Sequence, residues 1–186
     1  MTTLNDIISS LDERLMLAEQ AQASSSRTQR VSKVQEKMRK YVLVDIETTK
    51  LAIPIDGLAE IGAMPPVTPL PNLPPWIHGI VNQRGEIISV IDLNYFLQGG
   101  AVARAHGKKL AILRGQAIKV GICISQVTAT ISRTESDRRQ IQDSPLSVLV
   151  PEVFSGSLRV GEVDYLILNP EELLGMDRLR QYYLAA

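Results

Sequence analysis

Residues 81–93, VNQRGEIISVIDL, decide the fold that is predicted for this chain. Two apolar segments that alternate like β-strands flank a polar corner, residues 82–85, and this pattern is typical of a hairpin. Arg84 lies at the tip of the corner. From this stretch alone, Arg84 could be a catalytic clamp, a phosphate ligand, a docking point or a residue of a solvated turn.

The same strand pattern extends on both sides of the corner. Residues 41–46 and 51–55 read as two strands joined by a tight turn, and the prolines of residues 65–75 favour an extended segment. The second half repeats this order, because RGEIISVIDLNYFL at 84–97 resembles VGEVDYLILNPEELL at 160–174. The repeat aligns three pairs of residues, with one residue of slippage: Gly85 with Gly161, Glu86 with Glu162, and Leu97 with Leu174. We therefore predict a mainly β protein with two related subdomains, as small barrels or a sandwich.

The two ends of the chain have helical patterns. Residues 1–40 contain two short amphipathic segments and a polar linker, which either pack on the β-rich body or bind a partner or a second copy. Residues 41–186 form the predicted main domain. Near its end, Asn169 and Pro170 are typical of a helix start, and Gly175 predicts a kink or break. We expect residues 98–107 to form a loop, and residues 129–145 to form a loop with a short helix.

Composition narrows the class of function. The chain has 186 residues, 20 Lys plus Arg against 20 Asp plus Glu, and 4% aromatic residues. Nucleic-acid binders usually carry a basic excess, so this class is not favoured; it stays the alternative, because a small barrel could hide a basic face in a neutral total. No segment reads as a signal peptide or as the ~20 apolar residues of a membrane span, so we expect a cytoplasmic protein without direct membrane insertion.

No catalytic or cofactor motif is readable. The single cysteine, Cys123, lies in an apolar stretch and is expected to be a small buried residue. His78 and His106 have no partner at zinc-ligand spacing, and we expect His78 to be half-buried and structural. Nucleotide-binding and nucleophile motifs are absent from the sequence. We expect neither an enzyme nor a cofactor, although a small hydrolase or transferase that depends on His78 is a further alternative.

An ordered series of segments resembles the CheW-like domain of bacterial chemosensory adaptors. The series runs through LAIPIDGLAEI, PPWIHGIVNQRGEIISVIDL, KKLAILRGQAIKVGICISQV, VLVPEVFSG and GEVDYLILNPEELL, from residue 41 to the C-terminal region. Two residues depart from the usual pattern. Gln83 replaces an apolar residue before the arginine, and Ser89 replaces a proline.

The resemblance implies a fold, a function and partners. CheW-like proteins consist of two five-stranded, SH3-like barrels that share a core, and they are not enzymes. They act as signalling scaffolds that bind a CheA-type histidine kinase and the cytoplasmic tip of a methyl-accepting receptor. We therefore expect a stand-alone adaptor in a chemotaxis or pilus-motility pathway, located at the membrane only through receptor complexes.

The resemblance also implies site residues. Arg84 matches the family arginine at the receptor-facing corner, and Glu60 matches an acidic residue that pairs with it. Leu58, Gly79 and Val81 match positions around the same receptor-binding region. For the kinase contact, the candidates are Ile53, Ile55, Ile87 and Val90, each of which could equally be a core residue. Since alternate residues of a strand face inward, at most half of these four can contribute to a surface.

Overall fold

The structure, a computed structural model, describes residues 37–47, 49–98, 107–141 and 150–182. Residues 1–36, which hold most of the predicted helical N-terminal extension, lie outside the described residues, as does any self-association through its helices. The same holds for most of the predicted loop at 98–107. All statements below concern the described residues.

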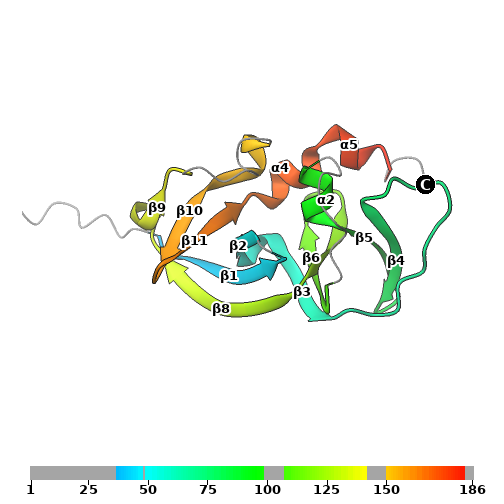
Figure 1. The fold of residues 1–186 in the computed structure, drawn as a ribbon, viewed down its shortest axis with the longest axis horizontal. Coiled ribbons are helices and arrows are strands. Elements are labelled where there is room, and N and C mark those ends of the chain that lie inside the picture. Colours follow the sequence, from blue (N-terminus) through cyan, green and yellow to red (C-terminus); the bar gives the residue numbers. More distant parts are fainter. Residues whose placement is uncertain (1–36, 48, 99–106, 142–149, 183–186) are drawn as a thin grey trace, which may run out of the picture. The chain divides into compact units, whose positions relative to one another are not determined.

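Two β-sheets dominate the fold (Figure 1), so the predicted mainly β class is confirmed. In the first sheet, which we call the first barrel, the strand order is β8-β1-β2-β11-β10-β9. In the second sheet, the second barrel, the order is β3-β6-β7-β5-β4. The strands are β1 (Arg39–Ile46), β2 (Thr49–Pro54), β3 (Leu58–Ala63), β4 (Ile77–Gln83), β5 (Glu86–Ile91), β6 (Lys109–Arg114), β7 (Lys119–Ile124), β8 (Gln126–Arg133), β9 (Arg138–Arg139), β10 (Phe154–Val160) and β11 (Val163–Leu168).

Short helices connect and cap these strands. The α-helices are α2 (Leu93–Leu97), α4 (Pro170–Gly175) and α5 (Asp177–Arg180), and the 3₁₀ turns are η1 (Ile55–Gly57), η2 (Glu135–Asp137) and η3 (Pro151–Val153). The predicted break at Gly175 is confirmed, because α4 ends there and α5 begins at Asp177. Arg178 of α5 lies 4.9 Å from the ring centre of Phe96 and 5.8 Å from that of Trp76, which fastens the C-terminal segment to the body.

Each barrel contains strands from both sequence repeats. The first repeat supplies β1 and β2 to the first barrel and β3, β4 and β5 to the second; the second repeat supplies β6 and β7 to the second barrel and β8 to β11 to the first. Within each sheet all neighbours are antiparallel except one pair, β2 with β11 and β5 with β7. The repeat therefore predicted two related subdomains correctly, but one repeat does not correspond to one barrel.

Three hydrophobic clusters explain the long apolar runs in the sequence. Tyr41 and Leu43 of β1 face a cluster inside the first barrel, whereas Val42 and Val44 face a larger cluster that both barrels share. The second barrel has its own cluster, which includes Val90 and Cys123. Central strands are thus buried on both faces, and both alternating sets of side chains must be apolar.

The two halves of the repeat have matching local geometry. Gly85 and Gly161 lie in two-residue hairpin turns with φ of 87° and 62°. Directly after the strand that follows each turn, an Asx residue caps a short helix: Asp92 Oδ1 accepts from Tyr95 N at 2.9 Å, and Asn169 Oδ1 accepts from Glu172 N at 3.5 Å. This turn–strand–cap unit is the physical content of the repeat.

Two boundaries differ from the sequence prediction. β1 begins at Arg39, inside the predicted N-terminal helical segment, because Arg39 and Lys40 pair with Arg133 and Ser132 of β8. For the same reason, residues 129–133 form the second half of β8 and not a loop. Val127, Ala129 and Ile131 alternate with polar residues along β8, as in a half-buried edge strand. The polar and charged residues that follow led to the loop prediction from residue 129 on.

Candidate functional site

The polar corner is the tip of the β4–β5 hairpin. Gln83 pairs with Glu86, and the two residues between them, Arg84 and Gly85, both have positive φ, 54° and 87°. This is the geometry of a type I′ turn, which Asn and Gly adopt most easily. Asn82 Oδ1 accepts from Gly85 N at 2.9 Å and supports the turn. An arginine in the left-handed region costs conformational energy, so the fold holds Arg84 in an unfavourable backbone geometry.

Glu60 joins this corner to the opposite edge of the second barrel. Its Oε1 accepts from Arg84 Nη2 at 3.1 Å and from Gln83 Nε2 at 3.0 Å. Because β3 and β4 are the two edge strands of the five-stranded sheet, these contacts link its first and last strands. The side chain of Arg84 is 80% exposed, so the ion pair itself stabilises the fold by only ~0–1 kcal/mol. It orients the guanidinium more than it stabilises the barrel.

A second ion pair lies beside the first. Lys119 Nζ is 2.6 Å from Glu86 Oε2, and both residues line the same hollow of about 250 Å³ as Glu60, Gln83 and Arg84. Gln83 and this second pair were not predicted from the sequence as parts of the site. The only signal for Gln83 in the sequence was the departure from the family's apolar residue. The structure gives that departure a reason, since the amide donates to the carboxylate that also holds Arg84.

The other three predicted receptor-binding residues lie beneath this surface. Leu58 and Val81 are 9% and 2% exposed and pack in the shared core and in the second barrel's cluster, respectively. Gly79 is buried in β4 with φ of 142°, and a Cβ there would overlap the carbonyl oxygen of Thr68. Of the five residues, the structure therefore brings only Glu60 and Arg84 together at the surface.

The four predicted kinase-binding residues divide into two pairs. Ile53 and Val90 are fully buried, so for them the alternative of a core residue applies, and they offer no surface to a partner in this fold. Ile55 is 47% exposed and Ile87 is 60% exposed. Only these last two can contribute apolar contact area.

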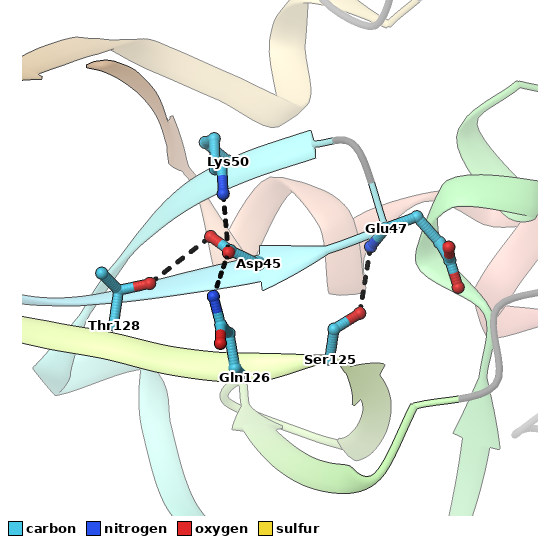
Figure 2. Close-up of polar contacts among 6 residues, drawn as sticks. All are labelled: Asp45, Glu47, Lys50, Ser125, Gln126 and Thr128. Atoms are coloured by element: carbon cyan, nitrogen blue, oxygen red, sulfur yellow. Dashed lines mark hydrogen bonds and ion pairs between the residues drawn. The ribbon is translucent and has the colours of Figure 1, made fainter. Parts of the chain in front are cut away.

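A polar cluster around the buried carboxylate of Asp45 lies where the chain passes from one barrel to the other (Figure 2). Ser125 is the single residue between β7 and β8, and its N–H donates to Asp45 O at 2.8 Å. The Asp45 carboxylate accepts from Lys50 Nζ and Gln126 Nε2, both at 2.6 Å. Burial raises the pKa of Asp45, but the hydrogen bonds from Lys50 and Gln126 outweigh it, so the pKa is lowered overall.

We expect Asp45→Asn to destabilise the protein by about 1–3 kcal/mol near pH 7, because the charged acceptor of these hydrogen bonds is lost. A lowered folded-state pKa stabilises the fold above the unfolded value of 3.8, and this stabilisation is lost as the pH falls through the folded pKa. Urea unfolding at about pH 7 and about pH 3 measures the effect, and the gap between wild type and variant should shrink at the lower pH.

Asp164→Asn is the matched control for that experiment. Asp164 pairs with Arg159 at 3.0 Å, but both side chains are exposed, so its replacement should change the free energy of unfolding by less than about 0.5 kcal/mol. An Asp45→Asn effect of equal size at both pH values would contradict the titration argument.

The described residues offer little for catalysis. Cys123 is buried, as expected, and burial raises the pKa of its thiol to about 12. His78 is half-buried, with Nε2 4.0 Å from Asp92 Oδ2. In the part of the chain that the structure describes, no group of three or more His, Cys, Asp or Glu side chains could hold a metal ion. Within that same part, no helix is long and apolar enough to cross a membrane.

Comparison with known proteins places the chain in a family. The family model described as CheW-like domain matches residues 40–178. The chemotaxis protein CheW of Klebsiella aerogenes is 26% identical over 142 residues, which cover 76% of this chain and 84% of that protein. Protein FrzA of Myxococcus xanthus is 28% identical over 107 residues, covering 58% and 60%.

A solved structure supports the fold. The scaffolding protein TtCheW of Thermoanaerobacter tengcongensis aligns with a TM-score of 0.64 at 21% identity, covering 76% of this chain and 95% of that one. The two-barrel architecture expected from the sequence is therefore confirmed. With the family model spanning most of the chain, the protein belongs to the CheW-like family of chemotaxis scaffold proteins.

Proposed function

We propose that this protein couples a methyl-accepting receptor to a CheA-type histidine kinase, in a chemotaxis or pilus-motility pathway. The observation that carries the proposal is the corner at Arg84. Arg84 has a backbone conformation that arginine disfavours, and its guanidinium is exposed. Glu60 accepts hydrogen bonds from both Arg84 and Gln83. Such an arginine can donate a forked pair of hydrogen bonds to a carboxylate or carbonyl of a partner.

The receptor contact in this proposal consists of Arg84 and Glu60. Leu58, Gly79 and Val81 support the strands beneath them and act on docking through the fold. The kinase contact consists of Ile55 and Ile87, the two candidates whose side chains are exposed. In this proposal, residues 41–186 form the adaptor domain, residues 1–40 form an extension, and the protein works in the cytoplasm beside the membrane.

We expect Arg84→Glu to weaken receptor binding by about tenfold or more and to leave kinase binding unchanged, because it reverses a charge at the receptor contact only. Binding of the full-length chain to the purified kinase and to the receptor's cytoplasmic fragment, measured in parallel, tests this. Arg159→Glu is the matched control, since Arg159 is also an exposed arginine paired with a carboxylate but lies in the first barrel.

A charge swap separates docking from barrel closure. Glu60→Arg combined with Arg84→Glu restores an ion pair within the corner but presents the charges in reverse. If Arg84 contacts the receptor, the double variant stays defective. If the double variant binds the receptor like wild type, the pair only closes the barrel, and the docking proposal fails.

A further inference from the structure

A polar hollow of about 510 Å³ lies at one end of the first barrel, outside the docking corner. Its wall combines the ends of β1, β2, β6, β9, β10 and β11 with the η1 turn and the start of α4. A volume of this size is within the range of small-molecule sites. The side chains with polar chemistry on its wall include Arg39, Arg114, Arg138, Ser155, Asp56 and Glu171.

Two of the three arginines are held by the η1 turn. Arg114 Nε donates to the backbone carbonyl oxygen of Asp56 at 3.2 Å. Arg39 Nη2 lies 3.7 Å from Asp56 Oδ2, in an ion pair whose side chains are both more than half exposed. The turn is itself packed tightly, because a Cβ at Gly57 would come within 3.0 Å of Pro170 Cβ. The η1 turn therefore gives Arg114, and more loosely Arg39, a fixed backbone to contact at the hollow.

The third arginine is held by β10 and by a neighbouring carboxylate. Arg138 Nη1 lies 2.7 Å from Glu135 Oε1, and the side chain lies against the backbone of β10 at Gly156. A Cβ at position 156 would come 2.7 Å from Arg138 Nε, so only glycine leaves room for this packing. Because these contacts already order the long side chain, less conformational entropy is lost when a ligand binds.

The guanidinium donors of the wall favour an anionic ligand. Two of the three arginines already face a carboxylate, Arg39 that of Asp56 and Arg138 that of Glu135. Arg114 is held by the backbone carbonyl oxygen of Asp56, a contact that does not offset its charge. The contacts above use one nitrogen of each guanidinium, and a guanidinium has five N–H donors. Convergent guanidinium groups bind carboxylate and phosphate oxygens in a forked geometry.

We propose that this hollow is a binding site for a small organic oxyanion, a compound with a phosphate or carboxylate group. In this proposal Arg114 of β6 and Arg138 of β9 bind the anionic group, and Ser155 donates a further hydrogen bond. The site shares no residue with the proposed receptor and kinase contacts, although its residues Pro54 and Asp56 flank Ile55 of the kinase contact.

Calorimetric titration of the full-length chain at low ionic strength tests the proposal. The probes are ribose 5-phosphate, citrate and, as a neutral match, ribose. We expect at least one of the two anions to bind, no binding of ribose, and weaker binding as salt is added. Tighter binding of ribose 5-phosphate assigns the site to phosphates, and tighter binding of citrate assigns it to carboxylates.

Variants locate the binding in the hollow. Arg114→Ala and Gly156→Ala should each weaken binding by about tenfold or more, the first by removing a donor and the second by displacing Arg138. Arg114→Lys keeps the charge without the fork and should fall between, which guards against a folding defect in Arg114→Ala. Arg159→Ala should bind like wild type. Absence of binding of either anion at concentrations up to about 10 mM, or equal binding by wild type and all Arg114 variants, would overturn the proposal.

Discussion

Replacement of Gly79 by alanine is expected to lower the free energy of unfolding by about 2–4 kcal/mol. Gly79 has φ of 142°, a region that side chains with a Cβ rarely adopt. In addition, an added Cβ would overlap the carbonyl group of Thr68, whose backbone exchanges hydrogen bonds with Ile80 at 2.8 and 2.9 Å. The strand and the proline-rich segment cannot both keep their positions. Urea unfolding followed by the fluorescence of Trp76 measures the loss.

Gly62→Ala is the matched control for Gly79. Gly62 also lies in an edge strand of the second barrel, and the space around a Cβ there is open to 4 Å. We expect its replacement to change the free energy of unfolding by less than about 0.5 kcal/mol. Equal effects at the two glycines would contradict the steric argument. Any receptor-binding defect of Gly79→Ala should scale with its loss of stability, since Gly79 presents no side chain.

Replacement of Ile53 by alanine is expected to cost about 2–5 kcal/mol, because it opens a cavity in the core that both barrels share. Ile53 is fully buried, so water cannot replace the contacts that its side chain makes. Ile55→Ala, two residues later in the chain, should cost less than about 0.5 kcal/mol, since Ile55 is 47% exposed. Denaturant unfolding of the two variants under the same conditions compares them.

The same two variants distinguish a role in the hydrophobic core from a role in the kinase contact. If Ile55 contributes to kinase binding, Ile55→Ala weakens the kinase complex by about threefold to tenfold while the stability is unchanged. Ile87→Ala should behave in the same way. Normal kinase affinity in both variants would remove Ile55 and Ile87 from the proposed contact, whatever the result for Ile53.

The different positions of Ile53 and Ile55 illustrate what alternation in a sequence can and cannot predict. A period of two places both on one face of a strand. The strand ends at Pro54, however, and the η1 turn points the chain away, so Ile55 leaves the sheet. The sequence predicted the strand itself correctly, because the run is apolar. It could not predict the position of its last residue, which depends on how β3 joins the other barrel.

The other features that the sequence could not predict depend on pairing between distant segments of the chain. The turn–strand–cap unit was visible in the sequence because Gly85, Gly161, Asp92 and Asn169 act locally. The parallel pairing of β2 with β11 depends on residues far apart in the chain, and no local pattern encodes it. Glu60 and Arg84 came together in the prediction only through the family resemblance. The role of Gln83 required the coordinates of both edge strands.

The exchange of strands between repeats has a mechanical consequence. If each repeat formed its own barrel, the two barrels would be joined by one covalent tether and could swing on it. Here the backbone crosses between them at η1 and again at Ser125, and the shared core fills the space between the crossings. A load applied at the Arg84 corner is therefore carried through paired strands and packed side chains to the far barrel. We therefore expect the two barrels to move as one rigid unit and not to rotate independently.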